Sequence, residues 1–245
     1  MTEKFTIKKH DGPGRLTKIN NTLTPNTINL KKYKISPDKQ TTYNIEKEIA
    51  EYSVKKTLEN AEKEENKEIG VIQGSKYIDL RCQCAKKLEE LGYKYLIIAN
   101  SDELILHPQD LIETIIKIRE TIKPTTYLIF PFAEPSFIPL LSYIGIDFFN
   151  KETGLYYATL NVLITPTKNY DLETYPIYEM NLEELEKYNT NTIDFVLREV
   201  RTHMENNSLR NLVEERASSN PQIASALRIL DRNYQNYLQK YTQLY

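Results

Sequence analysis

Short apolar runs alternate along the chain with longer stretches in which apolar residues recur at helical spacing. Residues 95–99 form a nearly continuous apolar run, the pattern of a strand covered on both faces. Residues 108–122 instead place isoleucine and leucine side chains on one face of a helix. This alternation, with short connections, predicts parallel strands joined by helical crossovers, which is an α/β fold. The other expected segments are helices at 45–58, 78–91 and 137–144, and strands at 71–72, 126–132 and 146–149.

The two ends of the chain follow other patterns. Residues 5–19 predict a hairpin whose turn is Asp-Gly-Pro-Gly at 11–14. Residues 156–165 have the composition of an extended segment, and the chain is helical in pattern from Leu182 onward. We therefore expect one structural unit, in which residues 1–180 form the main domain and residues 181–245 a helical extension packed on it.

The charge balance gives no sign of a broad nucleic-acid-binding surface. The chain carries 32 Lys and Arg residues against 34 Asp and Glu residues, a formal net charge of −2. Any contact with RNA then depends on a local patch or on a partner. No apolar run is long enough to span a bilayer, and residues 1–11 carry charges where a signal peptide needs an apolar core. We expect a cytoplasmic protein.

The cysteines and histidines do not form a metal-binding pattern. Cys82 and Cys84 are two positions apart on an expected helix, so their side chains do not share a face. Together with His10, His107 and His203 they match no familiar spacing for a disulfide or a zinc site. We expect no metal and no cofactor, and take both cysteines as small, partly buried helix residues.

Residues 70–81 form the most informative motif, Gly-Val-Ile-Gln-Gly-Ser-Lys-Tyr-Ile-Asp-Leu-Arg. A short β-branched run delivers Gln73 to the C-terminal end of a strand, where its amide can donate to and accept from the edge of a base. The motif resembles the Val-Gln-Gly…Tyr…Asp-Leu-Arg signature of the tRNA-guanine transglycosylase superfamily. The archaeal branch is the closer match, especially archaeosine synthase. Read by itself, the motif fits a simple strand-to-helix turn equally well.

Other segments resemble the same family in the same order along the chain. Residues 11–16 and Thr24-Pro25 are similar to its opening hairpin and following strand, and residues 145–150 fall on its Gly-x-Asp-x-Phe-Asp motif. Residues 209–216 and 226–232 resemble a helical segment of the archaeal synthases. The resemblance implies a (β/α) TIM-like barrel of the transglycosylase type with a helical C-terminal extension. The barrel is expected to be reduced or incomplete, because only residues 20–44 stand where the family has several strands.

Departures from the family pattern bear on activity. The family's nucleophilic aspartate is Asn150 here, and an amide cannot form a glycosyl ester. Its glycine pair at a strand end is Ala99-Asn100. Its zinc-binding cysteines and histidine fall on residues 175–178 and Tyr188, which suggests that apolar packing replaces the metal. No RNA-binding domain follows within the sequence.

The resemblance and the strand ends together nominate a site. Asp102 follows a strand end and Asp147 belongs to the family motif, so both are candidate catalytic acids; helix capping or solvation for Asp102, and a purely orienting role for Asp147, are the alternatives. Gln73, Asn100 and Asn150 are the candidates for substrate binding. Lys32, Lys34 and Lys151 are the candidates for contacts to tRNA phosphates, with an ordinary solvated surface as the alternative.

By resemblance the process is tRNA modification, most specifically archaeosine biosynthesis. One hypothesis is a non-catalytic subunit that supports a catalytic homologue or a radical S-adenosylmethionine protein. Another is a compact enzyme that transfers lysine to 7-cyano-7-deazaguanine in tRNA, a step that needs no ribosyl nucleophile. A third is an α/β domain that works outside tRNA biology. The altered nucleophile, altered zinc ligands and near-neutral charge favour the subunit.

Overall fold

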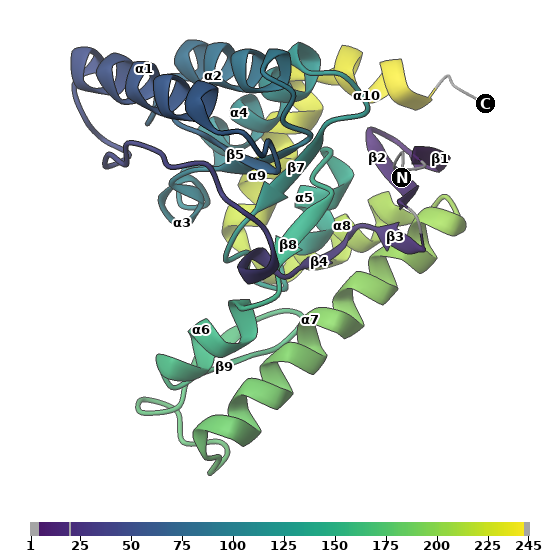
Figure 1. Ribbon diagram of the computed structural model, residues 1–245. Helices are drawn as coiled ribbons and strands as arrows, with labels where there is room; N and C mark the ends of the chain where they lie inside the picture. Colours follow the sequence, from purple (N-terminus) through teal and green to yellow (C-terminus); the bar gives the residue numbers. More distant parts are fainter. Residues whose placement is uncertain (1–4, 20, 243–245) are drawn as a thin grey trace. The chain divides into compact units, whose positions relative to one another are not determined.

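The computed structural model describes residues 5–19 and 21–242 (Figure 1). The chain divides into two compact units. One unit comprises the residues up to 28 together with those from 132 onward, and the other comprises residues 29–131. The expected helical extension is thus described up to residue 242, and its last three residues lie outside the described part of the chain.

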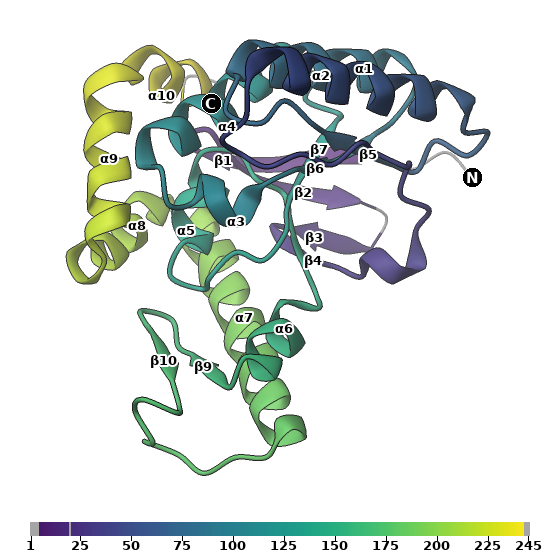
Figure 2. The same cartoon turned by 90° about the vertical axis from the view of Figure 1, so that its left-hand side faces the viewer.

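The unit of residues 29–131 is built on three parallel strands. Strands β5, β6 and β7 pair in the order β5–β6–β7, with Ile69 opposite Tyr95 and Tyr95 opposite Tyr127. Helices α1, α2 and α4 form a layer along these strands (Figure 2). The expected alternation of strand and helix is confirmed. The elements are η1 (Leu30–Lys32), α1 (Lys47–Lys63), β5 (Ile69–Ile72), α2 (Ile78–Glu90), β6 (Tyr95–Ile98), α3 (Ser101–Leu104), α4 (Pro108–Thr121) and β7 (Tyr127–Phe130).

Local signals in the sequence account for these boundaries. Helix α4 begins at Pro108, whose fixed φ and missing N–H suit the first helical position. Its apolar stripe is buried, with Leu111, Ile112 and Ile115 fully inaccessible to solvent. Helix α2 ends at Glu90, and Gly92 follows two positions later with a φ of +101°, a left-handed conformation that glycine tolerates best.

The other unit combines a hairpin, a parallel strand pair and a helical region. The expected hairpin is confirmed, because β1 pairs with β2 in antiparallel fashion with Asp11 opposite Gly14. Strand β4 pairs with β8 in parallel, and α7 packs against the hairpin, α5 and α8. The elements are β1 (Phe5–Asp11), β2 (Gly14–Ile19), β3 (Thr22–Thr24), β4 (Asn26–Ile28), α5 (Ile138–Tyr143), β8 (Phe148–Asn150), α6 (Thr153–Thr159), β9 (Val162–Ile164), β10 (Asn169–Asp171), α7 (Leu182–Glu205), α8 (Leu209–Ser219), α9 (Pro221–Asn233) and α10 (Gln235–Thr242).

The extended segment expected at 156–165 is wrong in its first half. Residues up to Thr159 belong to helix α6, and only Val162–Ile164 form a strand. Gly154 lets α6 approach α7 closely, since a Cβ at this position lies 2.5 Å from the Thr190 hydroxyl. Adjacent tyrosines favour strands by propensity, but packing against α7 overrides that preference here.

Candidate functional site

Gln73 and Asn100 follow the C-terminal ends of the neighbouring parallel strands β5 and β6. The Gln73 amide donates a hydrogen bond from Nε2 to Asp38 at 2.6 Å, and the side chain is almost fully buried. Asn100 has a left-handed backbone (φ 54°) and donates from Nδ2 to the Thr41 carbonyl at 2.9 Å. The connection between η1 and α1, which contains Asp38 and Thr41, therefore packs against these strand ends.

Arg81 ties the two strand ends together from helix α2. Its Nε donates to the Ser75 carbonyl at 2.6 Å and its Nη1 to the Ala99 carbonyl at 2.9 Å. The guanidinium is completely buried, and desolvation lowers its pKa to about 10. Gly74 permits this arrangement, because a Cβ there lies only 2.7 Å from the Arg81 backbone nitrogen.

Three buried polar atoms remain unsatisfied at these strand ends. Gln73 Oε1, Asn100 Oδ1 and Arg81 Nη2 have no hydrogen-bond partner within residues 5–19 and 21–242. Buried polar groups in folded proteins are almost always paired with protein, water or ligand. Two acceptors and one donor suit a small polar group that offers both kinds of atom.

Tyr43 adds an aromatic and acidic element to the same unit. Its ring stacks on His107 with centroids 5.1 Å apart, and its hydroxyl donates to the Asp110 carboxylate. Burial, followed by the bond to Asp110, raises the pKa of Tyr43. Asp102 lies in α3 with its side chain exposed, whereas Glu103 accepts a long 3.4 Å bond from the Tyr43 backbone.

The other candidate residues belong to the second unit. Asp147 is 1% exposed and forms a bidentate ion pair with Arg15, from Nε to Oδ1 at 2.7 Å and from Nη2 to Oδ2 at 3.0 Å. Asn150 ends strand β8, and its Oδ1 accepts from the Glu152 backbone N–H at 3.1 Å. Both side chains are therefore engaged in contacts that hold the ends of strand β8.

The structure thus places the candidates in two sets, each within its own unit. Gln73, Asn100 and Asp102 lie in the unit of residues 29–131, and Asp147 and Asn150 lie in the other. The candidate lysines divide likewise: Lys32 and Lys34 belong to the first unit and Lys151 to the second.

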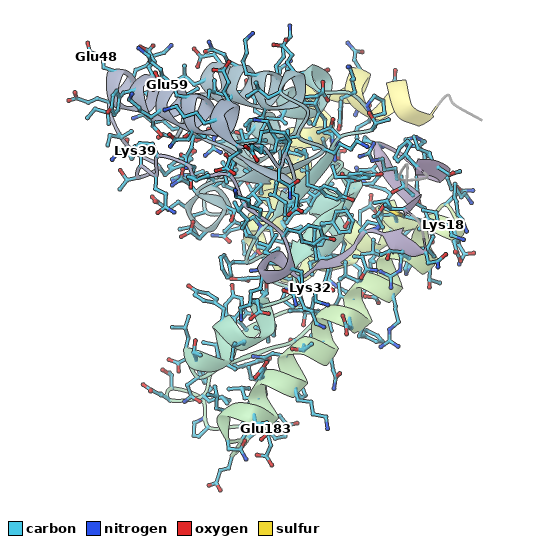
Figure 3. The ribbon with its side chains drawn as sticks, viewed as in Figure 1. Lys18, Lys32, Lys39, Glu48, Glu59 and Glu183 are labelled. Carbon is cyan, nitrogen blue, oxygen red and sulfur yellow. The ribbon has the colours of Figure 1, made fainter. Side chains whose placement is uncertain are left out.

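The three lysines differ in their surroundings. Lys32 and Lys151 have exposed side chains, and Lys32 is labelled in Figure 3. Lys34 forms an ion pair with Glu64 that raises the pKa of the lysine. Phosphate contacts through these lysines stay predictions, with Lys34 already engaged by a carboxylate.

Several residues that surround Gln73 and Asn100 were not identified from the sequence. Asp38, Thr41 and Tyr43 lie in a polar stretch without periodicity, which carries no signal for a site. Arg81 closes the motif at 70–81, and its place in that motif was the one available signal. Its function as a tie between strands becomes visible only when Ser75 and Ala99 are brought together.

The region expected to replace a zinc site does not pack as expected. Tyr175, Ile177 and Tyr178 are 59%, 49% and 56% exposed, so the expectation that apolar packing takes the place of the metal is wrong for them. A small core beneath them consists instead of Ala158, Leu163, Leu172 and Leu185.

The described residues show neither a group of metal ligands nor a membrane-spanning helix. Within residues 5–19 and 21–242, no three His, Cys, Asp or Glu side chains are grouped so that they could hold a metal ion. Over the same part of the chain, no helix has the length and apolar character needed to cross a membrane.

Residues 34–187 of the chain match the family described as "TGT: Queuine tRNA-ribosyltransferase". The chain belongs to this family. Gln73, Asn100 and Asn150 all lie within the matched residues. The resemblance drawn from the motif at 70–81 is confirmed, and with it the α/β class with parallel strands that the family implies.

Archaeal members of the transglycosylase family are among its relatives. The chain is 33% identical over 140 residues to archaeosine synthase of Methanocaldococcus jannaschii, covering 57% of this chain and 23% of that protein. It is 31% identical over 221 residues to tRNA-guanine(15) transglycosylase of Thermococcus onnurineus, covering 79% of this chain and 38% of the relative. The corresponding enzyme of Pyrococcus furiosus is 28% identical over 222 residues. The chain therefore spans well under half the length of these relatives.

Proposed function

We propose that this chain works in tRNA modification in the cytoplasm, in archaeosine biosynthesis, as a non-catalytic subunit beside a catalytic protein. The names of its relatives, archaeosine synthase and tRNA-guanine(15) transglycosylase, support the process. One observation carries the non-catalytic role: the acidic residue of the family motif, Asp147, is buried in a bidentate pair with Arg15 beside an asparagine at the nucleophile position.

Asn150 supports the absence of base exchange. Its amide has no anionic oxygen with which to attack a ribose. The Oδ1 atom is engaged by the Glu152 N–H, and only 5% of the residue is exposed. Loss of a nucleophile costs several powers of ten in rate, about 6–8 kcal/mol of barrier. A transglycosylase reaction on this chain is therefore not supported.

Asp147 supports the same conclusion by its contacts. A general base must reach the proton that it removes. Both oxygens of Asp147 instead accept from the Arg15 fork, and the pair is shut away from solvent. A carboxylate held in this way positions the hairpin against strand β8. We assign Asp147 a structural function.

A lysine-transferring enzyme is the second candidate, and the unit of residues 29–131 favours it. The buried oxygens of Gln73 and Asn100 are unsatisfied by the described residues, as expected if they accept hydrogen bonds from a base or an amine. Asp102 lies two positions after Asn100 in the sequence and is exposed. In such an enzyme it would be the carboxylate that binds the lysine amine. Neither candidate function requires a bound cofactor on this chain.

The composition of the native complex tests the proposal. The tagged protein is purified from its own host at natural abundance, and bound proteins and RNA are identified by mass spectrometry. We expect a transglycosylase-family or radical S-adenosylmethionine protein together with tRNA. If neither kind of protein nor tRNA copurifies with the chain, the subunit function loses its support.

Complementation separates the two candidates. In cells that lack the gene, we expect archaeosine to be lost from tRNA and to return with the wild-type chain and with Asp102→Asn. Because Asp102 is exposed, we expect Asp102→Asn to fold as the wild type does. If Asp102→Asn binds the partner normally but no archaeosine forms in tRNA, the result supports a lysine-transferring enzyme instead of a non-catalytic subunit.

A further inference from the structure

The segment of residues 171–186, from the end of β10 to the first turns of α7, displays apolar side chains to solvent. Tyr175, Ile177, Tyr178 and Leu182 are between 49% and 59% exposed. Contiguous exposed apolar side chains on a protein surface mark sites of interaction. Figure 2 shows this segment as the long connection between β10 and α7.

The fold holds this segment by its ends and leaves its middle free of the core. Leu172 belongs to the small core with Ala158, Leu163 and Leu185, and Met180 packs against that core. Asp171 caps the turn, accepting from the Glu173 backbone at 3.0 Å and from the Thr174 hydroxyl at 2.8 Å. The intervening tyrosines and isoleucine contribute little to this core, because 49–59% of each residue is exposed to solvent.

The same segment carries only negative charge. Among residues 171–186 there are six carboxylates and no Lys, Arg or His. Glu184 has a local function in the capping box with Asn181 at the start of α7. Glu173 and Glu179 lie outside the helix and are exposed, and Glu183 projects at the first turn of α7 (Figure 3). A charge of one sign beside exposed aromatic side chains constrains what can bind.

This charge selects among the possible occupants. RNA phosphates are repelled by a surface without a basic side chain. A second copy of the segment would place like charges against each other, which is unfavourable by several kcal/mol in general. A protein surface that combines Lys or Arg with apolar pockets is complementary in both respects.

A hollow of about 550 Å³ beside the segment fits the same partner. Its lining includes the apolar Leu172, Pro176, Tyr178 and Met180 and the acidic Glu179 and Glu184. Pockets that accept one anchoring side chain are where binding energy concentrates at interfaces. An arginine or lysine, with its apolar stem and cationic head, suits this lining.

We propose that residues 171–186 form a docking surface for a different protein, whose contact surface is basic and apolar and inserts a Lys or Arg side chain beside Tyr178. This inference rests on the proposed subunit function and adds the surface and the chemistry of the partner. It assigns no catalytic function to the segment.

Photo-crosslinking in the native host tests the docking surface. p-Benzoylphenylalanine replaces Tyr178 in the full chain, and the control places it at Tyr52 of α1, which is 51% exposed. We expect the Tyr178 position to form an adduct with another protein, and the crosslinked peptide to contain Lys or Arg among apolar residues. Glu173→Lys with Glu179→Lys should lower the yield at least about tenfold at low salt and less at high salt.

Binding to the crosslinked protein gives a second measurement. With both proteins purified, Tyr178→Ser should weaken binding by about 30-fold or more, the size expected of an interface hot spot, and Tyr52→Ser should leave it unchanged. Adducts with a second copy of this chain, adducts with RNA, or equal effects at Tyr52 would each overturn the proposal, as would the absence of any adduct at Tyr178.

The identity of the crosslinked protein separates the two levels of inference. A basic partner with no part in tRNA modification would leave the docking surface standing and reject the proposed function. A tRNA-modification complex that forms without contact at Tyr178 would do the reverse.

Discussion

The buried pair of Arg15 and Asp147 allows a quantitative prediction. The two side chains are 7% and 1% exposed and share two hydrogen bonds of 2.7 and 3.0 Å. Arg15→Met keeps the apolar stem and removes the cation, so it leaves a carboxylate buried without its counter-ion. Removing one partner of a buried pair costs about 3–5 kcal/mol of unfolding free energy, because the remaining charge stays desolvated.

The double variant distinguishes this cause from lost packing. Arg15→Met with Asp147→Leu removes both charges and retains apolar volume, so we expect a loss below about 2 kcal/mol, smaller than either single change. Unfolding in urea is followed by far-UV circular dichroism for the wild type, both single variants and the double variant. Arg198→Met, at an exposed arginine of α7, is the matched control and should cost less than about 0.5 kcal/mol.

The result bears on function as well as on stability. If Arg15→Met costs no more than Arg198→Met, the ion pair does not hold Asp147 in the folded protein. The carboxylate would then be free to act as a base, and the argument for a non-catalytic chain would lose its main support. A double variant as unstable as the sum of the two single variants would refute the electrostatic cause.

Three further predictions concern other parts of the chain. Gly74→Ala should lower the free energy of unfolding, measured by thermal unfolding, by about 2 kcal/mol or more, because the φ of Gly74 is +144° and an added Cβ would lie 2.7 Å from the Arg81 backbone nitrogen. Gly92→Ala is the control and should lower it by about 1 kcal/mol, because an added Cβ at Gly92 would meet nothing within 4 Å. Burial raises the pKa of the Cys84 thiol to about 12. In the folded protein at neutral pH, Cys84 should therefore be alkylated far more slowly than the less buried Cys82, as followed by mass spectrometry. Unfolding in urea should abolish this difference in rate. Because folding raises the pKa of the Cys84 thiol, the protonated thiol stabilises the folded state fully below about pH 9, and this stabilisation is lost as the pH rises toward 12. Asn189→Ala should lower the free energy of unfolding by about 2–3 kcal/mol and speed amide exchange in β9, because the fully buried amide donates to the Val162 carbonyl at the start of that strand and accepts from the Ile164 N–H at its end; unchanged exchange would contradict this.

The regular elements of the unit of residues 29–131 could be predicted from the chain because local physics determines them. The apolar spacing of residues 108–122, the proline that opens α4 and the glycine after α2 are all short-range signals. The prediction was wrong where propensity and packing disagree. Tyr156 and Tyr157 favour a strand, but the approach of α6 to α7 at Gly154 decides for a helix.

The candidate site divides in the same way. The amino-acid sequence determined that Gln73 follows a strand, that Asn150 cannot act as a nucleophile, and that residues 171–186 are acidic, since each of these follows from residue type and local order. Only the tertiary structure decided that Arg15 meets Asp147 across 132 positions, that Arg81 joins two strand ends, and that Tyr175 and Tyr178 stay in solvent. These are long-range contacts, and their free energies depend on burial and on which groups are brought together, which a one-dimensional pattern does not specify.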